Sequence, residues 1–198
     1  MPPSASPASF VLASTSPRRQ ALRAQLGLTF VIEAPDVDET VHPGEAPAAY
    51  VERVAQAKAG VVAGRYTSLP VLAADTSVVV GSDVLGKPES DAHAKAMLRR
   101  LSGADHRVLT GVALAGPLSA FVLVETVVTF RPLSPSEIDW YVGTGEGRDK
   151  AGGYASQARA AAFIRSMQGS ATNVIGLPLA ETLGLLAKAG VRLPWAAP

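Results

Sequence analysis

Pro70-Val-Leu-Ala-Ala-Asp-Thr-Ser-Val-Val-Val80 is the stretch that decides the fold, because two apolar runs of strand length flank the polar pair Asp75-Thr76. Gly81-Ser-Asp83 follows with turn-forming residues, and Val84-Leu85 resumes the apolar pattern. Apolar runs bounded by such turns are typical of buried strands and hairpins. The stretch therefore predicts a buried strand that enters a hairpin, with Asp75 at or near the end of the buried part.

Apolar runs and helical stripes follow one another irregularly along the rest of the chain. Strands are predicted at 10–13, 29–32, 107–115, 120–130 and 162–164, helices at 17–27, 47–64, 90–103, 134–142 and 178–190, and a glycine-rich loop at 143–158. Because strands and helices do not alternate strictly, the pattern predicts a mixed α/β sheet in two lobes around a cleft. The sequence contains no repeat and no linker, so we expect a single domain over 1–198, with 1–9 flexible.

The composition excludes several classes of protein. The 198 residues are 47% hydrophobic and 18% charged, which suits one compact domain and excludes a long disordered chain. A formal net charge of +1 is too small for bulk charge to bind nucleic acid or an anionic membrane, so any anion site must be a local cluster. Without cysteine there is no disulfide, thiolate metal site or cysteine nucleophile, and we expect the cytoplasm.

No targeting or membrane segment is expected. The N-terminal region lacks a basic segment and has an apolar run of only Phe10 to Ala13, unlike a signal peptide. The longest uncharged stretch, Val108 to Val124, is shorter than the ~20 residues that span a bilayer and is interrupted by Gly116-Pro117.

Basic residues stand beside predicted turns. They are Arg18 and Arg19 at the start of the first predicted helix, and Lys58, Lys87 and Lys150 near loops or turn glycines. A single such lysine is usually a solvated surface charge, but together these residues could converge on a polyanion. The helix start would add free amides and a positive dipole end, and Ser14, Thr15 and Ser16 would add hydroxyl donors.

Gly81-Ser-Asp-Val-Leu-Gly86-Lys87-Pro88 nearly matches the phosphate-loop pattern. That pattern requires Ser or Thr after the lysine and a helix that starts there, whereas Pro88 has no hydroxyl and disfavours helix at Lys87. We therefore exclude a phosphate-loop ATPase and keep Lys87 as a candidate phosphate contact.

Two groups of carboxylates are candidates for chemistry. Asp75 is either a turn residue that accepts backbone hydrogen bonds or a general base or metal ligand in a cleft. The loop with Asp36, Asp38 and Glu39 is either solvated or metal-binding. Magnesium binds a few carboxylates together with substrate phosphate oxygens, and Asp75 and Glu39 could supply them.

Other residue types give little support to a site. His42, His93 and His106 lack metal-ligand spacing, and we expect them at the surface or in turns. The absence of a Gly-x-Ser-x-Gly elbow leaves a serine hydrolase without support. Trp140, Tyr141 and Phe163 lie in apolar contexts and are predicted to be core residues.

Many short motifs in register resemble the Maf family of nucleoside triphosphate pyrophosphatases. They are Ala13-Ser-Thr-Ser-Pro-Arg-Arg19, Asp38-Glu39, Ala57-Lys-Ala59, Ala74-Asp-Thr76, Gly86-Lys-Pro88, Leu101-Ser-Gly103, Thr110-Gly111, Asp149-Lys-Ala-Gly152, Gln157 and Gly176-Leu-Pro-Leu179. The resemblance implies an elongated central sheet with flanking helices and two lobes, similar to inosine triphosphate pyrophosphatases, and often a homodimer. It also implies hydrolysis of a nucleoside triphosphate to monophosphate and diphosphate with a divalent metal cation, Mg or Mn. Members are also called septum formation inhibitors, so a non-catalytic regulator that binds nucleotide is the alternative.

The resemblance also assigns roles to individual residues. It makes Asp75 the proton acceptor and places Arg18, Thr76 and Gln157 among the residues that select the substrate. Arg19, Glu39, Lys58, Lys87 and Lys150 match polar motif positions near the cleft, and Ser14 joins the substrate-binding candidates.

The residue at position 18 indicates which branch of the family the sequence resembles. Ser16-Pro-Arg-Arg19 is similar to the branch that hydrolyses dTTP and UTP, whereas the 7-methyl-GTP branch typically has tryptophan at the position of Arg18. The sequence departs from Ile-Gln-Gly at Ser156-Gln-Ala158 and from Gly-Ser-Tyr at Gly169-Ser-Ala171, and Ser14-Thr-Ser16 also occurs in the 7-methyl-GTP branch. The expected activity is that of a dTTP/UTP pyrophosphatase, with 7-methyl-GTP as the alternative substrate.

Overall fold

The computed structural model describes residues 8–21 and 25–196. Its strands are β1 (Phe10–Ala13), β2 (Phe30–Glu33), β3 (Val71–Val80), β4 (Asp83–Leu85), β5 (Asp105–Ala115), β6 (Ala120–Phe130) and β7 (Ile164–Gln168). Its α-helices are α1 (Pro17–Gln20), α3 (Pro47–Ala63), α4 (Asp91–Leu101), α5 (Pro135–Gly143), α6 (Ala171–Ile175) and α7 (Leu179–Lys188), with 3-10 helices η1 (Ala151–Gly153) and η2 (Arg159–Phe163).

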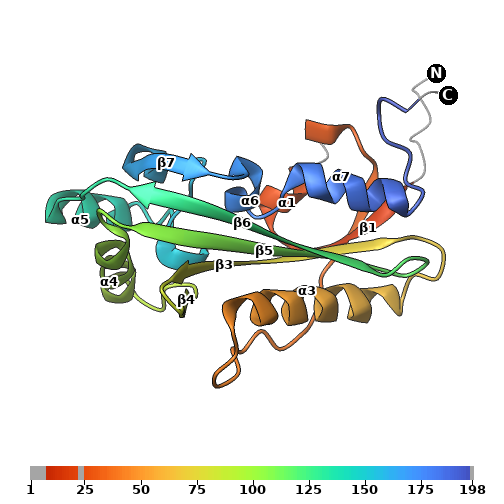
Figure 1. Cartoon of the computed structure of the whole chain (residues 1–198), viewed down its shortest axis with the longest axis horizontal. Coiled ribbons are helices and arrows are strands. Elements are labelled where there is room, and N and C mark those ends of the chain that lie inside the picture. Colours follow the sequence, from red (N-terminus) through yellow and green to blue (C-terminus); the bar gives the residue numbers. More distant parts are fainter. Residues whose placement is uncertain (1–7, 22–24, 197–198) are drawn as a thin grey trace.

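The strands form one mixed sheet, in which β3, β5 and β6 run along most of the molecule (Figure 1). The order is β2-β1-β3-β5-β6-β7, and β4 also pairs with β3. β1 is parallel to both β2 and β3, whereas the other pairs are antiparallel. The predicted mixed α/β class is therefore confirmed.

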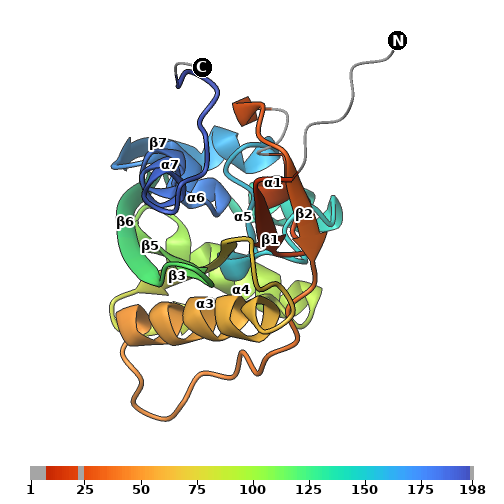
Figure 2. The same cartoon turned by 90° about the vertical axis from the view of Figure 1, so that its right-hand side faces the viewer.

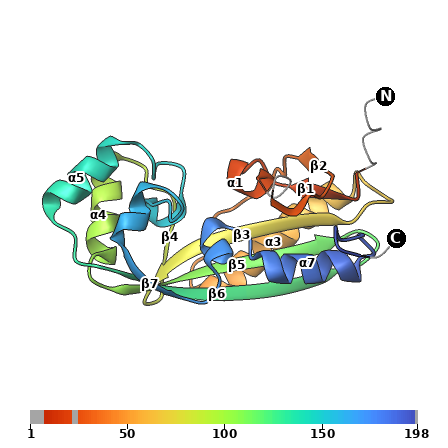
Figure 3. The ribbon, with the colours of Figure 1, turned by 90° about the horizontal axis from the view of Figure 1, so that it is seen from above.

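The pairing of β3 creates the two lobes. β5 pairs with one edge of β3 from Val71 to Val79. On the other edge, β1 pairs at Val71 and Leu72, and β4 pairs at 78–80. Among the residues that the structure describes, no strand lies beside 73–77 on that edge, so the sheet forks there. Figure 3 shows β1, β2 and α1 on one side of the fork and β4, α4 and α5 on the other.

Helices cover both faces of the sheet, with α3 on one face and α6 and α7 on the other (Figure 2). Because successive strand residues point to opposite faces, side chains of β3 pack against the helices on both faces of the sheet. Val71 and Ala73 pack in the cluster that includes the inner face of α3. Leu72 and Ala74 pack with residues of α7. Asp75 therefore points towards α3, and Thr76 points to the opposite side.

The lobe beyond the fork has its own apolar core. Leu98 and Leu101 of α4 pack there with Phe130, Tyr141 of α5 and Phe163 of η2. The Phe163 ring meets the Phe130 and Tyr141 rings edge-on, with centroids 6.1 and 5.3 Å away. Such edge-to-face contacts add to the stability supplied by burial. None of the described helices has the length and apolar character needed to cross a membrane.

Most predicted elements are confirmed, and four differ. Asp75 lies in the middle of β3, not near its end. Ala162 and Phe163 belong to η2, and the strand begins at Ile164. The short helix α6 was not predicted. The first predicted helix is observed over Pro17–Gln20, with Ala21 as its C-cap. Residues 22–24 lie outside the described residues, as do 1–7 of the expected flexible segment.

Gly111 allows α3 to pack closely on β5. A Cβ at Gly111 would lie 2.8 Å from the Val51 carbonyl oxygen and 3.0 Å from the Phe121 ring. Gly111→Ala should therefore lower the free energy of unfolding by roughly 1–3 kcal/mol. Gly60→Ala is the matched control, because Gly60 lies in α3 and no atom lies within 4 Å of a new Cβ there. This substitution should raise the free energy of unfolding by about 0.5–1 kcal/mol. Urea denaturation measures both, and a Gly111→Ala protein as stable as the wild type would contradict this packing.

Candidate active site

A cleft of about 610 Å³ lies at the fork of the sheet. Segments from both sides of the fork line it, including the β1–α1 turn, the middle of β3 and residues 149–151 and 154–157. The ten residues singled out from the sequence all line this cleft: Ser14, Arg18, Arg19, Glu39, Lys58, Asp75, Thr76, Lys87, Lys150 and Gln157.

The cleft has a local excess of positive charge. The charged side chains that line it are five cations, namely Arg18, Arg19, Lys58, Lys87 and Lys150, and three carboxylates, namely Glu39, Asp75 and Asp149. The five against three leave +2 within the cleft, although the whole chain carries only +1. A concave surface with one sign of excess charge attracts a polyanion of the opposite sign.

Lys58 joins two carboxylates at the centre of the cleft. Its Nζ lies 2.9 Å from Asp75 Oδ1 and 2.9 Å from Glu39 Oε1. Lys58 and Asp75 are each 6% exposed, whereas Glu39 comes from the loop between β2 and α3 and is open to solvent. Burial of an unpaired ammonium or carboxylate is costly, so each partner stabilises the other in this position.

The sequence places Lys58 here through helical periodicity. It lies on the buried stripe of α3, four residues after Val54 and four before Val62. That stripe faces the side of β3 to which Asp75 points. Lys58 is therefore buried between helix and sheet, and the solvated-surface interpretation of this lysine is wrong.

The same carboxylates suit a divalent cation that is shared with phosphate. Asp75 and Glu39 converge on one point, since both lie 2.9 Å from the same Nζ. The described part of the chain contains no group of three or more His, Asp or Glu that could hold a metal alone. Mg²⁺ is commonly bound by one or two carboxylates, water and substrate phosphate oxygens, and this donor set fits that mode.

Arg19 is held in a fixed orientation. Its Nε donates a hydrogen bond to the Gly176 carbonyl oxygen at 2.8 Å, and its Nη2 donates to Thr76 Oγ1 at 3.1 Å. Burial lowers the pKa of Arg19, an effect that Asp75 opposes. A guanidinium has five N–H donors, so three remain for other acceptors.

Arg18 connects the two sides of the fork. Its Nε donates to the Ile175 carbonyl oxygen at 3.2 Å, and its Nη1 lies 3.8 Å from Asp149 Oδ2. Asp149 also pairs with Lys150, whose hydrogen bond lowers the pKa of Asp149. Lys150 Nζ donates a second hydrogen bond to the Glu146 carbonyl oxygen at 2.7 Å. These contacts set the position of two cations at the mouth of the cleft.

Three candidate side chains have free hydrogen-bonding capacity. Lys87 and Gln157 are exposed and make no side-chain hydrogen bond with any residue that the structure describes. Ser14 is buried, and its Oγ accepts from the Ser16 N–H at 3.2 Å, so its own proton can be donated. The dipole argument for the first helix is not supported, because α1 spans four residues as described.

The glycine-rich loop that bears Asp149, Lys150 and Gln157 is tightly fitted. A Cβ at Gly147 would lie 1.9 Å from the Gly153 carbonyl oxygen, so only glycine fits at that position. The Gly152 N–H donates to the Gly86 carbonyl oxygen at 3.0 Å, which ties the loop to the residue before Lys87.

The sequence of this chain matches known proteins over most of its length. The family model for Maf-like proteins matches residues 9–189. The chain belongs to the Maf-like family. It is 54% identical over 187 residues to a dTTP/UTP pyrophosphatase from Myxococcus xanthus (strain DK1622), covering 94% of this chain and 95% of that protein. A dTTP/UTP pyrophosphatase from Symbiobacterium thermophilum is 52% identical over 181 residues, covering 91% of this chain and 93% of that protein.

A solved structure of a HAM1 protein from Coxiella burnetii is also similar. It is 18% identical, covers 92% of this chain and 100% of that chain, and has a TM-score of 0.44. A likeness at this level carries no argument about fold or function. The fold of this Maf-like chain rests on its own strand pairing.

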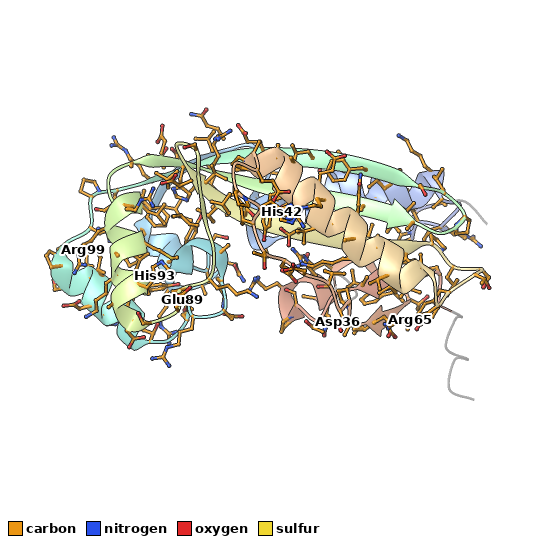
Figure 4. The ribbon with its side chains drawn as sticks, turned by 90° about the horizontal axis from the view of Figure 1, so that it is seen from below. Asp36, His42, Arg65, Glu89, His93 and Arg99 are labelled. Carbon is orange, nitrogen blue, oxygen red and sulfur yellow. The ribbon has the colours of Figure 1, made fainter. Side chains whose placement is uncertain are left out.

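The histidines of this Maf-like protein do not gather. Figure 4 shows His42 in the loop before α3 and His93 on α4, well separated. The expectation for His106 is wrong, because it is 2% exposed and its Nε2 lies 2.8 Å from the Tyr154 hydroxyl. Burial lowers the pKa of His106 to about 4. Trp140 is also not a core residue, since 53% of it is exposed.

Sequence reasoning missed four polar residues around the site. Tyr50 lies on the buried stripe of α3, and its hydroxyl donates to the Glu39 carbonyl oxygen at 2.9 Å and holds that loop. Asp149 was noted only within a motif, and Thr110 and Asn173 received no role. Thr110 and Asn173 are fully buried. The sequence signal for such residues is a polar side chain inside an apolar run, because a polar side chain that becomes buried must make hydrogen bonds.

His106 should make the stability of this protein depend on pH. Its folded pKa of about 4 lies below the ordinary 6.5, so its contribution is fully present above pH 6.5 and is lost as pH falls towards 4. Between pH 7 and pH 4.5 the loss should be about 2 kcal/mol. His106→Gln should show a correspondingly smaller decrease, and His93→Gln, at an exposed site, should behave as wild type. Equal decreases in the free energy of unfolding for His106→Gln and wild type would contradict this assignment.

Proposed function

We propose that this chain is a nucleoside triphosphate pyrophosphatase that converts dTTP and UTP to the monophosphate and diphosphate. The observation that carries the proposal is a buried carboxylate, Asp75, within a cleft that has a net positive charge. Two relatives, 54% and 52% identical to this chain over most of its length and of theirs, are named dTTP/UTP pyrophosphatase. Their name supports dTTP and UTP as the substrates.

The cationic side chains bind the triphosphate in this proposal. Arg19 offers three N–H donors from a fixed position, and Arg18 and Lys150 stand at the mouth of the cleft. Lys87 adds an exposed ammonium group from the opposite side of the fork. The main contribution of such groups is to position the phosphates and to stabilise charge that develops during the reaction.

Asp75 acts as the proton acceptor. A water oxygen attacks the α-phosphorus and forms the new P–O bond while its proton moves to Asp75. The bond between the α-phosphorus and the bridging oxygen breaks, and diphosphate leaves with the electron pair. When bound by Glu39 and Asp75, Mg²⁺ or Mn²⁺ supplies charge neutralisation at the phosphate oxygens. Lys58 keeps both carboxylates directed into the cleft.

Gln157 and Arg18 are proposed to select the base, and Thr76 contributes to substrate selection through Arg19, from which it accepts a hydrogen bond. The Gln157 amide offers one acceptor and two donors, which can pair with the donor and acceptor edge of uracil or thymine. It is exposed at the rim of the cleft and therefore accessible to a bound nucleotide. Cytoplasmic location and a homodimer stay predictions of the sequence.

A screen of nucleoside triphosphates tests the proposed function. The purified protein should release diphosphate from UTP and dTTP faster than from CTP, ATP, GTP or 7-methyl-GTP. Chelator should abolish the release, and Mg²⁺ or Mn²⁺ should restore it. Faster hydrolysis of 7-methyl-GTP would favour the other branch of the family. Release from none of these substrates would favour a nucleotide-binding regulator.

Asp75→Asn should lower kcat for UTP by about 10²–10⁴, because an amide cannot accept the proton and is a poor metal ligand. UTP binding should persist, because the cationic side chains remain. Glu125→Gln is the matched control, since Glu125 pairs with Arg107 away from the cleft and its loss should leave kcat unchanged. Steady-state kinetics and calorimetric binding measure these effects. An Asp75→Asn enzyme with wild-type turnover removes Asp75 from the reaction.

Gln157→Ala should lower kcat/KM for UTP and dTTP by roughly two- to tenfold, the range for loss of one hydrogen bond at an exposed site. Hydrolysis of ATP should change less, because a purine presents a different edge. Gln168→Ala is the control, since Gln168 is exposed at the end of β7 and outside the cleft. An equal loss for all triphosphates would show that Gln157 does not read the base.

A further inference from the structure

A chain of hydrogen bonds leads from the cleft into the interior of the protein. Arg19 Nη2 donates to Thr76 Oγ1 at 3.1 Å, and Thr76 Oγ1 lies 2.9 Å from Thr110 Oγ1. Thr110 Oγ1 in turn donates to the Asn173 carbonyl oxygen at 3.1 Å. Thr110 and Asn173 are fully buried and do not line the cleft.

The direction of these hydrogen bonds follows from their last member. A backbone carbonyl only accepts, so the single proton of Thr110 points to Asn173. Thr110 Oγ1 must then accept the proton of Thr76, for which the Gly176 carbonyl oxygen, at 3.5 Å, is a more distant alternative. The Thr76 lone pairs are left to accept from Arg19. Thr76 therefore has no proton to give to a bound nucleotide, and its role is to orient Arg19.

Asn173 also anchors the segment that holds both arginines. Its Nδ2 donates to the Val108 carbonyl oxygen at 2.9 Å and to Thr126 Oγ1 at 3.0 Å. These bonds fasten α6 to β5 and β6. Directly after Asn173, the carbonyl oxygens of 175 and 176 accept hydrogen bonds from Arg18 Nε and Arg19 Nε. The buried polar network thus holds Arg19 by two separate routes.

We propose that Thr110 and Asn173 are positioning residues for substrate binding: they fix the Arg19 guanidinium so that its three unused N–H donors are available to the phosphate oxygens. The proposal rests on the proposed function, in which the cleft binds a nucleoside triphosphate. A guanidinium held in advance loses less freedom when it binds a phosphate, which favours tight and correctly oriented binding.

Substitution of Thr110 tests the role of its hydroxyl group. Thr110→Val keeps the shape but removes the hydroxyl, and it should lower kcat/KM for UTP roughly tenfold, as expected for a lost buried hydrogen bond. Thr110→Ser keeps the hydroxyl and should retain activity within about threefold. Thr182→Val is the matched control, since Thr182 is buried on α7 and its Oγ1 has no hydrogen-bond partner among the described residues. It should leave kcat/KM unchanged.

A double-mutant cycle with Arg19→Lys separates positioning from a general structural effect. Lysine cannot make the two fixed contacts of Arg19. In the Arg19→Lys background, Thr110→Val should therefore lower kcat/KM for UTP by at most about twofold. Additive losses, or a Thr110→Val enzyme as active as wild type, would overturn the proposal. Thr110→Ala serves for the same cycle if the valine variant does not fold.

Binding measurements keep this test independent of catalysis. The same cycle is measured on the Kd for UTP by calorimetry, where the coupling between the two positions should again appear. A wild-type protein that binds UTP but releases no diphosphate contradicts the proposed function alone. A wild-type enzyme that is active, with no coupling between the two positions, contradicts the positioning role alone.

Discussion

β5 pairs with β3 along nearly the whole of β3, and this pairing leaves β3 only one free edge. β1 and β4 share that edge but meet it at its two ends, so within the described part of the chain no strand neighbours residues 73–77 there. Of the side chains that line the cleft, Asp75 and Thr76 come from β3 itself. The period of two along the strand directs Asp75 to the α3 side and Thr76 to the α6 side. The acid–base candidate and the group that orients Arg19 are therefore consecutive residues with different surroundings.

Three of the five cationic side chains that line the cleft are paired with carboxylates. Lys58 is buried between α3 and β3 and is tolerated because two carboxylates contact it. At the mouth of the cleft, Asp149 contacts Arg18 and Lys150 in the same way. In the proposed function, the phosphates of the substrate compete with these carboxylates for cationic partners. Mutual pairing keeps the cationic side chains directed into the cleft at a lower electrostatic cost than five unpaired cations would impose.

Close packing of the backbone has as large a part in the site as charge. Gly111 lets α3 approach β5, which brings Lys58 within reach of Asp75. Gly147 lets the loop fold onto Gly153, which places Lys150 and Gln157 at the rim of the cleft. Beneath this loop, Tyr154 is buried against His106. The contacts of Gly111 with Val51 and of His106 with Tyr154 join segments that are far apart in the sequence, whereas the contact of Gly147 with Gly153 lies within one loop.

The sequence by itself determined the local elements and the inventory of the site. Apolar periodicity located β3, β5, β6 and α3, and the residues together with their resemblance to the Maf family named ten residues that all line one cleft. These signals are local, since helix and strand periods need only neighbouring residues. Tertiary structure alone decided that Asp75 lies in mid-strand, that Lys58 and His106 are buried, that Trp140 is exposed, and that Thr110 and Asn173 connect to Arg19. Strand register and hydrogen bonds between distant segments set these features, and the residues themselves carry no local mark of their partners.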